Sequence, residues 1–458
     1  MSLRFGTDGV RGVANADLTP ELVLALGRAT ARCLSGETFL VGRDTRRSGT
    51  MLLAALAAGL AAEGSQVIDV GVMPTPGLAW LATDRHHPAA VISASHNPFP
   101  DNGIKLLSSS GQKLADETEH TIEAELDAIL DLGAGSGRGT PVGAALGSVR
   151  VDPDAHEHYV AHLVSAADFD KSSLAVVLDC ANGAASSVAP EVLRRLGVAA
   201  TVLFAEPDGT NINAGCGSTD PLALSETVVR LGADLGLGFD GDADRLIAVD
   251  GRGGVVDGDR LIALFACDLE ARGELPGSGV VVTVMSNLGL RRALEARGIE
   301  MTVTAIGDRN VVISMEENGY GLGGEQSGHI VFRRDATTGD GILTGLRLIG
   351  LLERAGRPLA ELAAEAMQAM PQELRSVQIE DPGRVTTHAG VAEEIAAIEA
   401  ELGGSGRVLV RASGTEEVVR VMVEAEVPEL AAVAAERLVA VVVRELGSPR
   451  RQVDAATP

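Results

Sequence analysis

The chain contains 458 residues, of which 45% are hydrophobic and 22% are charged, and its formal net charge is −25. This composition is typical of folded globular proteins, and the length predicts two to four domains of about 100–200 residues each. A surface this acidic repels nucleic-acid phosphates and anionic lipids, so we expect neither a nucleic-acid nor a membrane partner.

The cysteines indicate a reducing compartment. Cys33, Cys180, Cys216 and Cys267 are far apart and form neither a C-x-x-C pair nor a zinc-ligand spacing, which excludes a disulfide framework and a zinc finger. The first residues contain no apolar signal core, and the longest apolar stretch, 51–62, is shorter than a bilayer span of about 20 residues. We therefore expect a cytoplasmic protein.

Strand and helix patterns alternate through the first third of the chain, which predicts an α/β layer. The expected strands are 39–42, 66–70 and 89–93, and the expected helices are 48–63, 76–82 and 117–130. A glycine- and serine-rich run over 133–141 marks the end of this first unit.

The same alternation then occurs twice more. The second unit is expected to contain strands over 174–179, 200–204 and 234–238 and helices over 187–196 and 222–231. The third is expected to contain helices over 260–272, 290–297 and 310–317, strands over 280–285 and 300–305, and an extended segment over 321–332. No fixed-period repeat is present, which argues against a solenoid.

The last part of the chain has a different pattern, with strands expected over 376–380, 407–411 and 418–423 and helices over 392–402 and 430–446. The predicted fold class is α/β, with three tandem α/β domains whose mixed sheets are sandwiched by helices, plus a smaller C-terminal α+β domain. The expected boundaries are 1–150, 151–252, 253–365 and 366–447, followed by a polar tail over 448–458.

Three carboxylates follow the strand expected at 234–238. Asp240, Asp242 and Asp244 can converge on one point only if the segment forms a tight loop, and oxygen-only ligands suit a hard cation such as Mg²⁺. An EF-hand calcium loop is excluded because its sixth and twelfth positions would be Arg245 and Gly251 rather than glycine and glutamate. A solvated acidic turn is the alternative, and the small spacers between the aspartates favour the metal.

A serine and a histidine follow the strand expected at 89–93, in the run Ser93-Ala-Ser95-His96-Asn97-Pro98. The end of a buried strand is where α/β folds place their sites, and a serine beside a histidine is a candidate nucleophile. A plain turn is the alternative. Lys105 follows at an expected strand start, as an acid, a charge clamp or a surface residue.

Two later loops are candidate ligand contacts, with a structural turn as the alternative for each. Gly323-Gly-Glu325-Gln-Ser327-Gly-His329 combines small residues with donors and acceptors that match hydroxyl groups. Arg411-Ala-Ser413-Gly-Thr415, with Arg420 nearby, has the hydroxyl, guanidinium and backbone N–H groups of a phosphate cradle.

Two N-terminal polar loops place arginines where an anion could bind. These are Phe5-Gly-Thr-Asp-Gly-Val-Arg11-Gly and Gly42-Arg43-Asp-Thr-Arg46-Arg47-Ser-Gly. Solvated arginines are the alternative in both loops.

Together and in this order, these segments resemble the α-D-phosphohexomutases, and the resemblance runs from Phe5 to about Glu424. It implies four domains around one central cleft, each contributing one loop. It also implies that Ser95 carries the transferable phosphate and that one Mg²⁺ per chain is bound by Asp240, Asp242, Asp244 and a phosphoserine oxygen at Ser95.

The resemblance assigns roles to the other candidates as well. It implies that Arg11, Lys105 and His329 line the reaction centre. It implies that Glu325 and Ser327 contact sugar hydroxyls and that Arg245 belongs to the substrate-binding residues. The loop that holds the non-reacting phosphate would consist of Arg411, Ser413, Gly414, Thr415 and Arg420.

Gln326 favours the branch of the family that acts on glucosamine phosphates. This branch implies that glucosamine 6-phosphate and glucosamine 1-phosphate are interconverted through a phosphoserine and a bisphosphate, for UDP-N-acetylglucosamine and cell-wall precursor synthesis. A branch acting on mannose or glucose phosphates is one alternative, and a non-catalytic sugar-phosphate binder is another. The expected partner is a small hexosamine phosphate, and a homodimer is left open. Asn310, Ala412 and Glu417 depart from the family's usual residues.

Overall fold

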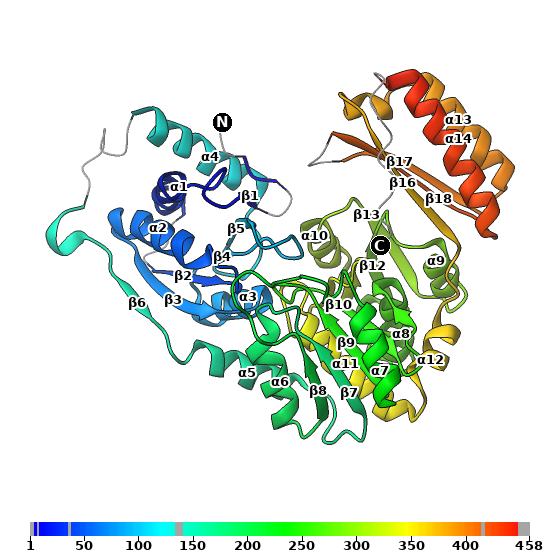
Figure 1. Cartoon of the computed structure of the whole chain (residues 1–458), viewed down its shortest axis with the longest axis horizontal. Helices are drawn as coiled ribbons and strands as arrows, with labels where there is room; N and C mark the ends of the chain where they lie inside the picture. The colour runs from blue at the N-terminus through cyan, green and yellow to red at the C-terminus, as the bar shows by residue number, and fades with distance from the viewer. Residues whose placement is uncertain (1–3, 7–8, 35–37, 133–140, 414–416, 448–458) are drawn as a thin grey trace. The chain divides into compact units, whose positions relative to one another are not determined.

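The computed structural model describes residues 4–6, 9–34, 38–132, 141–413 and 417–447. The chain divides into two compact units. The larger unit comprises residues 1–285 and 299–366, and the smaller unit comprises residues 286–298 and 367–458. Figure 1 labels most of the elements of both units.

The larger unit begins with a six-stranded sheet in the order β1-β5-β4-β2-β3-β6. β5 runs antiparallel to both of its neighbours, and the other pairs are parallel. The sequence of β4 is a continuous apolar run and every residue in it is buried, as expected for a central strand covered on both faces. The strands are β1 (Val10–Val13), β2 (Thr38–Arg43), β3 (Gln66–Val72), β4 (Ala89–Ile92), β5 (Asp101–Leu107) and β6 (Val149–Val151). The helices are α1 (Pro20–Cys33), α2 (Gly49–Ala62), α3 (Thr75–Arg85), α4 (Asp116–Leu132) and the 3₁₀ turn η1 (Gly143–Ala145).

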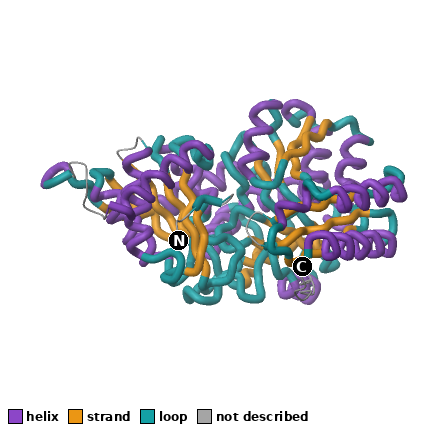
Figure 2. The backbone as a smooth tube through the Cα atoms, turned by 90° about the horizontal axis from the view of Figure 1, so that it is seen from above, coloured by secondary structure: helices purple, strands orange, loops and turns teal. Residues whose placement is uncertain are grey.

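A second sheet of the larger unit has the order β11-β10-β9-β7-β8, with β7, β8 and β9 parallel and β10 antiparallel to both neighbours. Helices pack beside its strands, and the tube in Figure 2 shows helices, in purple, next to groups of strands, in orange. The strands are β7 (Ala175–Asp179), β8 (Ala199–Leu203), β9 (Leu235–Phe239), β10 (Leu246–Asp250) and β11 (Val255–Val256). The helices are α5 (Ala155–Ala166), α6 (Ala185–Arg195) and α7 (Leu222–Leu231).

A third sheet has the order β13-β12-β14-β15, in which only the last pair is antiparallel. Asp257 and Asp340 cap the first turns of α8 and α11 by accepting backbone N–H groups, which fixes where each helix begins. The strands are β12 (Gly279–Thr283), β13 (Glu300–Thr304), β14 (Leu322–Gly324) and β15 (Ile330–Phe332). The helices are α8 (Gly258–Ala271), η2 (Pro276–Ser278), α10 (Asp308–Asn318), α11 (Gly341–Ala355) and α12 (Leu359–Ala366).

The three sheets share one connection. In each, a parallel strand passes through a short loop into an antiparallel neighbour: β4 into β5, β9 into β10, and β14 into β15. These loops are residues 93–100, 240–245 and 325–329, and they contain the serine, aspartate and glutamate candidates of the sequence. Each loop therefore begins at the carboxyl end of a parallel strand, where open α/β sheets bind their ligands.

The smaller unit is built on an antiparallel sheet in the order β16-β18-β17. Buried valines of the strands and alanines and leucines of α14 form its core. Its strands are β16 (Gln372–Gln378), β17 (Arg407–Ala412) and β18 (Val418–Glu424). Its helices are α9 (Leu288–Glu295), the 3₁₀ turn η3 (Pro382–Thr386), α13 (Ala389–Leu402) and α14 (Pro428–Leu446).

The expected fold class is confirmed: three mixed α/β sheets are followed by a smaller α+β domain. The segment 321–332 was expected to be extended, but it is a hairpin, because the glycine-rich loop reverses the chain between β14 and β15. The sequence patterns did not predict β1, α1, α5, β10 or α11. Almost every residue of α11 is buried, so it carries no polar face to reveal its helical period.

The remaining predictions concern the boundary run and the tail, the cysteines and the absence of a membrane span. Most of the boundary run 133–141 and the tail 448–458 lie outside the described residues. All four cysteines are free thiols. Among the helices that are described, none combines the length and the apolarity needed to cross a membrane.

Candidate active site

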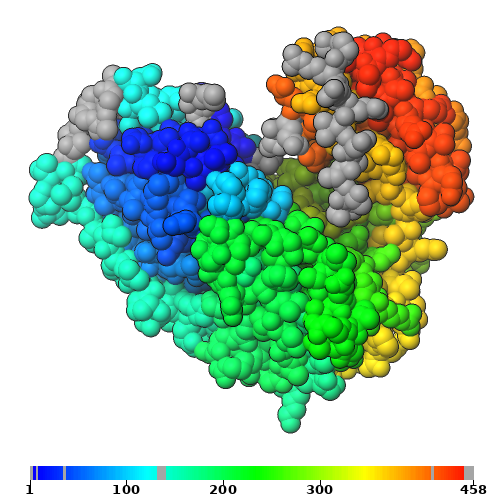
Figure 3. Space-filling model, in the orientation of Figure 1, coloured from blue at the N-terminus to red at the C-terminus, as the bar shows by residue number. Residues whose placement is uncertain are grey.

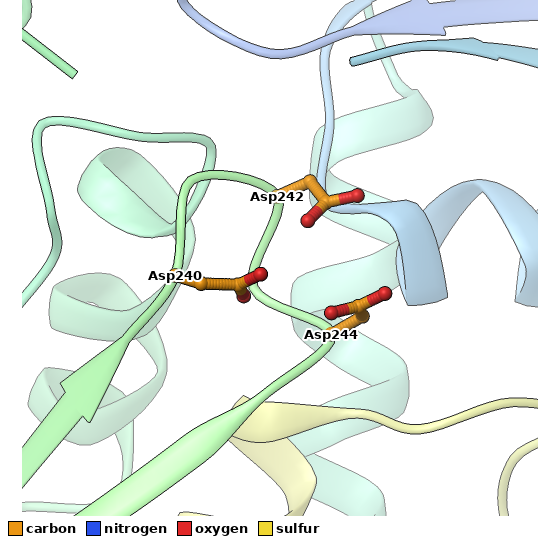
Figure 4. Close-up of side chains that lie close together, drawn as sticks. All are labelled: Asp240, Asp242 and Asp244. Carbon is orange, nitrogen blue, oxygen red and sulfur yellow. The ribbon is translucent and has the colours of Figure 1, made fainter. Parts of the chain in front are cut away.

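The three aspartates lie on the loop between β9 and β10, and their carboxylates turn toward one another (Figure 4). One carboxylate oxygen from each lies within 4.8 Å of the others, and all three residues are buried. The loop is tight because β9 and β10 are paired right up to its two ends, Phe239 opposite Leu246. The spacing i, i+2, i+4 therefore converges on one point, as the sequence required of a metal site.

Ser95 meets this cluster from the loop that follows β4. Its hydroxyl donates a hydrogen bond to Asp240 Oδ2 over 2.6 Å, and its side chain is buried. The two residues are 145 positions apart in the chain. Figure 3 shows the surface of the first sheet's domain, in blue, against that of the second, in green.

Lys105 approaches the cluster from the next strand. Its ammonium group donates to Asp242 Oδ2 at 3.0 Å and lies 3.7 Å from Asp244 Oδ2. The residue is in the middle of β5 and is 2% exposed, so the surface alternative is wrong for it. Thr75, at the start of α3, donates its hydroxyl to the same oxygen of Asp242 over 2.5 Å.

The electrostatics of the cluster are those of a crowded anionic site. Burial, together with the negative charges of Asp244 and Asp242, raises the pKa of Asp240 well above its usual range. Burial opposes ionisation of Asp244 too, but the surrounding cations hold its pKa well below its usual range. The cations are Lys105 and Arg245, and His329 adds a hydrogen bond to the same carboxylate. A divalent cation would remove the repulsion that raises the pKa of Asp240.

The donor set fits a divalent cation bound by oxygen atoms. Asp242 Oδ1 and Asp244 Oδ1 are buried, and neither has a hydrogen-bond partner among the described residues. Buried carboxylate oxygens without partners are costly unless something positive lies beside them. Hard oxygen donors of this kind are the ligands of Mg²⁺, which binds by one or two carboxylates and keeps places for phosphate oxygens.

The hairpin loop 325–329 supplies the glutamate and the histidine. Glu325 accepts the N–H of Gly307 with one oxygen (3.2 Å) and the hydroxyl of Ser327 with the other (3.3 Å). His329 is buried, with Nδ1 3.6 Å from Asp244 Oδ2. Its Nε2 accepts the N–H of Gly339 at 3.0 Å, which places the proton of the neutral ring on Nδ1, facing the aspartate.

Two arginines lie on the Ser95 side of the site. Arg245 Nη1 is 3.2 Å from His96 Nδ1, and its backbone N–H is donated to Asp240 Oδ1. Arg11, in β1, donates to Asn97 Oδ1 at 3.4 Å. Burial and the charges of these two arginines lower the pKa of His96 to about 4, so this ring is neutral beside Ser95 at neutral pH.

The candidate phosphate loop belongs to the smaller unit. Arg411 in β17 and Arg420 in β18 are directly paired across the sheet, and burial together with Arg420 lowers the pKa of Arg411. Two cations forced to face each other favour an anion between them. Ser413 donates its backbone N–H to Val418. Gly414 and Thr415 lie outside the described residues.

The sequence did not reveal the roles of two residues at this site, and it suggested the wrong environment for a third. Thr75 gave no signal. Gly241 was noted only as a small spacer, but a Cβ there would lie 2.5 Å from the carbonyl oxygen of Ser95, so only glycine lets the two loops touch. Arg46 was considered an anion contact or a solvated residue, but its side chain is fully buried.

Family models match nearly the whole chain. Domain I of the phosphoglucomutase/phosphomannomutase family matches residues 2–132, domain II matches 157–254, domain III matches 257–370 and the C-terminal domain matches 374–441. Such an arrangement of three α/β domains and a C-terminal domain, with a serine beside an aspartate triad, defines one class of enzyme. The chain belongs to the phosphoglucomutase/phosphomannomutase family, and the resemblance seen in the sequence is confirmed.

Comparison with individual proteins shows which members of the family this chain resembles. The chain is 51% identical over 447 residues to a phosphoglucosamine mutase of Desulforudis audaxviator, covering 96% of this chain and 98% of that one. A phosphoglucomutase/phosphomannomutase family protein of Burkholderia thailandensis has a similar structure, with a TM-score of 0.79, 25% identity and 97% of each chain covered. The fold is also that of Aspergillus fumigatus N-acetylphosphoglucosamine mutase, solved with GlcNAc-6P and magnesium (TM-score 0.69, 18% identity, 96% of each chain).

Proposed function

We propose that this enzyme interconverts glucosamine 6-phosphate and glucosamine 1-phosphate, with Ser95 as the phosphate carrier. The observation that carries the proposal is the 2.6 Å contact between the Ser95 hydroxyl and Asp240, one of three buried carboxylates that could together hold a divalent cation. The substrate follows from the high identity to a phosphoglucosamine mutase over nearly the full length of both chains.

The proposed cofactor is one Mg²⁺, held by Asp240, Asp242, Asp244 and an oxygen of phosphorylated Ser95. When bound, it supplies positive charge that offsets the charge of the phosphoryl group and of the carboxylates. Lys105 lies beside the same carboxylates and adds a second positive charge. Phosphoryl transfer needs little covalent chemistry from the protein, so in-line positioning and neutralisation of charge are what this site has to provide.

The proposed reaction has two transfers. In the first, the bond between Ser95 Oγ and phosphorus breaks while the free hydroxyl of the substrate bonds to that phosphorus, and a proton passes from the substrate hydroxyl to Ser95 Oγ by way of the groups in the pocket. The product is a hexosamine bisphosphate. In the second, the bisphosphate presents its other phosphate, which returns to Ser95 and leaves the isomeric monophosphate. A reversal of the sugar between the transfers is required because there is one serine carrier.

Glu325 and Ser327 are proposed to bind the sugar hydroxyls. Glu325 is half-buried, and its two carboxylate oxygens already accept hydrogen bonds from Gly307 and Ser327. These bonds hold the carboxylate in place before the sugar binds. Arg245 and Arg11 are proposed to contact the phosphate carried at Ser95. In the smaller unit, Arg411 and Arg420 are proposed to hold the phosphate that does not react, together with Ser413, Gly414 and Thr415.

The test is a coupled assay for glucosamine 1-phosphate, started with glucosamine 6-phosphate and compared with mannose and glucose phosphates by kcat/KM. We expect the glucosamine substrate to be preferred, Ser95→Ala to have no turnover, and Asp242→Asn to lose Mg²⁺-dependent turnover by at least about 100-fold while remaining folded. Ser165→Ala, at an exposed serine of α5, is the matched control. Full activity in Ser95→Ala, with no phosphoenzyme by intact mass, would reject the carrier.

A further inference from the structure

The backbone of the Ser95 loop is held in an unfavourable conformation. Ser95 has φ = +52°, in the left-handed region, which costs a residue with a side chain roughly 1–2 kcal/mol. Such a conformation persists only where its surroundings enforce it. Residues outside the proposed reaction centre supply that enforcement.

Arg46 is the main residue that holds the Ser95 loop in this conformation. Its Nε donates to Asp44 Oδ2 (2.8 Å), and its two other nitrogens each donate to two carbonyl oxygens. Three of these carbonyls belong to the Ser95 loop, and the fourth is that of Asp101 at the start of β5. Nη2 binds the carbonyls of Ser95 (2.9 Å) and Asn97 (2.7 Å). Nη1 binds those of Pro98 (2.5 Å) and Asp101 (3.0 Å).

This accounts for every N–H of the guanidinium group. An arginine side chain has five donors, and all five of those on Arg46 have partners inside the protein. The side chains of Arg46 and Asp44 are both 0% exposed. Arg46 therefore has no donor left for a substrate phosphate, and it cannot be the anion contact that its motif suggested.

The other side of the Ser95 peptide is held by a relay from the same aspartate. Asp44 Oδ2 accepts the hydroxyl of Ser93 (2.7 Å), and that hydroxyl oxygen accepts the backbone N–H of Ser95 (2.9 Å). The N–H and the C=O of the strained residue are thus both bound to groups that converge on one buried aspartate. Asn213 adds a second donor to the Ser95 carbonyl, at 2.9 Å.

We propose that Arg46, with Asp44 and Ser93, is a positioning device that sets where the Ser95 hydroxyl lies relative to the aspartate triad. This inference rests on the proposed function of Ser95 as the phosphate carrier. The device touches neither the substrate nor the triad, so it acts on the transfer rate by fixing the geometry of the serine. A displacement of about 1 Å at a reacting group is enough to slow a reaction about 100-fold.

The test compares Arg46→Lys with Arg150→Met, which alters an exposed arginine of β6 in the same sheet. A lysine keeps the charge but has three donors and no fork, so it cannot bind four carbonyls and Asp44 at once. We expect kcat to fall about 100-fold in Arg46→Lys with KM within about threefold of the parent, since the substrate contacts are intact. Arg150→Met should leave both unchanged. A kcat per folded molecule equal to that of the parent would overturn the proposal.

Ser93→Ala is the second variant, for the case in which Arg46→Lys does not fold. It removes one hydroxyl and frees the N–H of Ser95, and we expect a smaller fall in kcat, about tenfold, again without a change in KM. Equal falls in kcat and in the folded fraction would mean that the residues serve the fold alone, and would overturn the positioning role.

Hydrogen exchange separates this inference from the proposed function. In Arg46→Lys or Ser93→Ala, backbone amides of the peptide covering residues 93–101 should exchange faster, while those of the triad loop 240–245 should exchange as in the parent. This measurement does not need turnover. A parent without mutase activity would reject the proposed function, whereas unchanged exchange over 93–101 would reject the positioning device.

Discussion

At the scale of single residues, the site depends on a contact between two backbones. Gly241 of the triad loop lies against the Ser95 carbonyl, and a Cβ at Gly241 would also meet Ile212 at 2.8 Å and Asn213 at 2.9 Å. None of these neighbours is the free end of a long side chain on the surface. The loop that carries the aspartate triad and the loop that carries the serine can therefore be adjacent only while residue 241 has no side chain.

Gly241→Ala should push the two loops apart. We expect a loss of roughly 1–3 kcal/mol in the free energy of unfolding, typical of overpacking a close-packed site, and a lower kcat. Urea unfolding and the mutase assay measure the two effects. Gly383→Ala is the control, because its added Cβ would be 3.5 Å from the nearest atom. Equal stability of the two variants would contradict the close approach.

The neutral state of His96 also has a consequence for stability. Burial and the charges of Arg245 and Arg11 lower its pKa to about 4, below the value of about 6.5 in an unfolded chain. A depressed pKa contributes stability that is fully present above pH 6.5 and is lost as the pH falls toward 4, since the unfolded state binds the proton more tightly.

His96→Gln should remove this dependence in the unphosphorylated protein. We expect the fall in Tm between pH 7.5 and pH 5 to be smaller in His96→Gln than in the parent. His120→Gln, at an exposed histidine of α4, should keep the parent's fall. Differential scanning calorimetry at the two pH values checks this, and an identical fall in all three proteins would mean that His96 is not neutralised by its surroundings.

At the scale of elements, one connection has been used three times. The loops after β4, β9 and β14 each join a parallel strand to an antiparallel neighbour, and each carries a different set of candidate site residues. The smaller unit uses another antiparallel connection, between β17 and β18, for its pair of arginines. The register of β17 and β18 places Arg411 opposite Arg420, which is unfavourable unless an anion lies near them.

Arg420→Met should therefore weaken substrate binding more than it slows turnover. We expect KM for glucosamine 6-phosphate to rise about tenfold, the effect of losing one hydrogen bond between charged groups. Arg375→Met is the control, because Arg375 lies on the same sheet but is paired with Glu373 at 2.6 Å. Steady-state kinetics of both variants give the result, and an unchanged KM in Arg420→Met would remove this arginine from the phosphate site.

At the scale of the whole molecule, a positive charge from one domain compensates a negative charge from another. Lys105 comes from the first sheet and Asp242 from the second, and both side chains are at most 3% exposed. The lysine offsets part of the negative charge of the triad. Breaking a buried ion pair by removing one partner costs about 3–5 kcal/mol, because it leaves the other charge uncompensated.

Lys105→Met should make the fold more dependent on the cation. We expect a lower Tm than the parent in EDTA and a larger rise in Tm on addition of Mg²⁺, since the metal then supplies charge that the lysine no longer does. Lys171→Met, at an exposed lysine, should behave as the parent. Thermal unfolding with and without Mg²⁺ measures both, and an equal rise in the two variants would separate Lys105 from the metal site.

Local sequence patterns predicted much of the fold. The apolar run of β4, the alanine- and leucine-rich α2 and the exact limits of α7 follow from periodicity, which depends on neighbours in the chain. The same patterns did not predict α11, because burial on all sides removes the polar face that marks a helix. The triad was predictable because its three aspartates lie within five residues of one another, so their grouping depends on local sequence.

The sequence by itself determined which groups this protein brings to its chemistry: a serine, three closely spaced aspartates and a family likeness carried by motifs in a fixed order. Tertiary structure decided what those groups do to one another. Only the packing of two domains brings Ser95 to Asp240 and Lys105 to Asp242. Packing within the first domain buries Arg46 and directs its donors to the serine loop, so that it is no anion contact. Contacts between residues far apart in the chain depend on how whole sheets pack, and short-range patterns do not specify that.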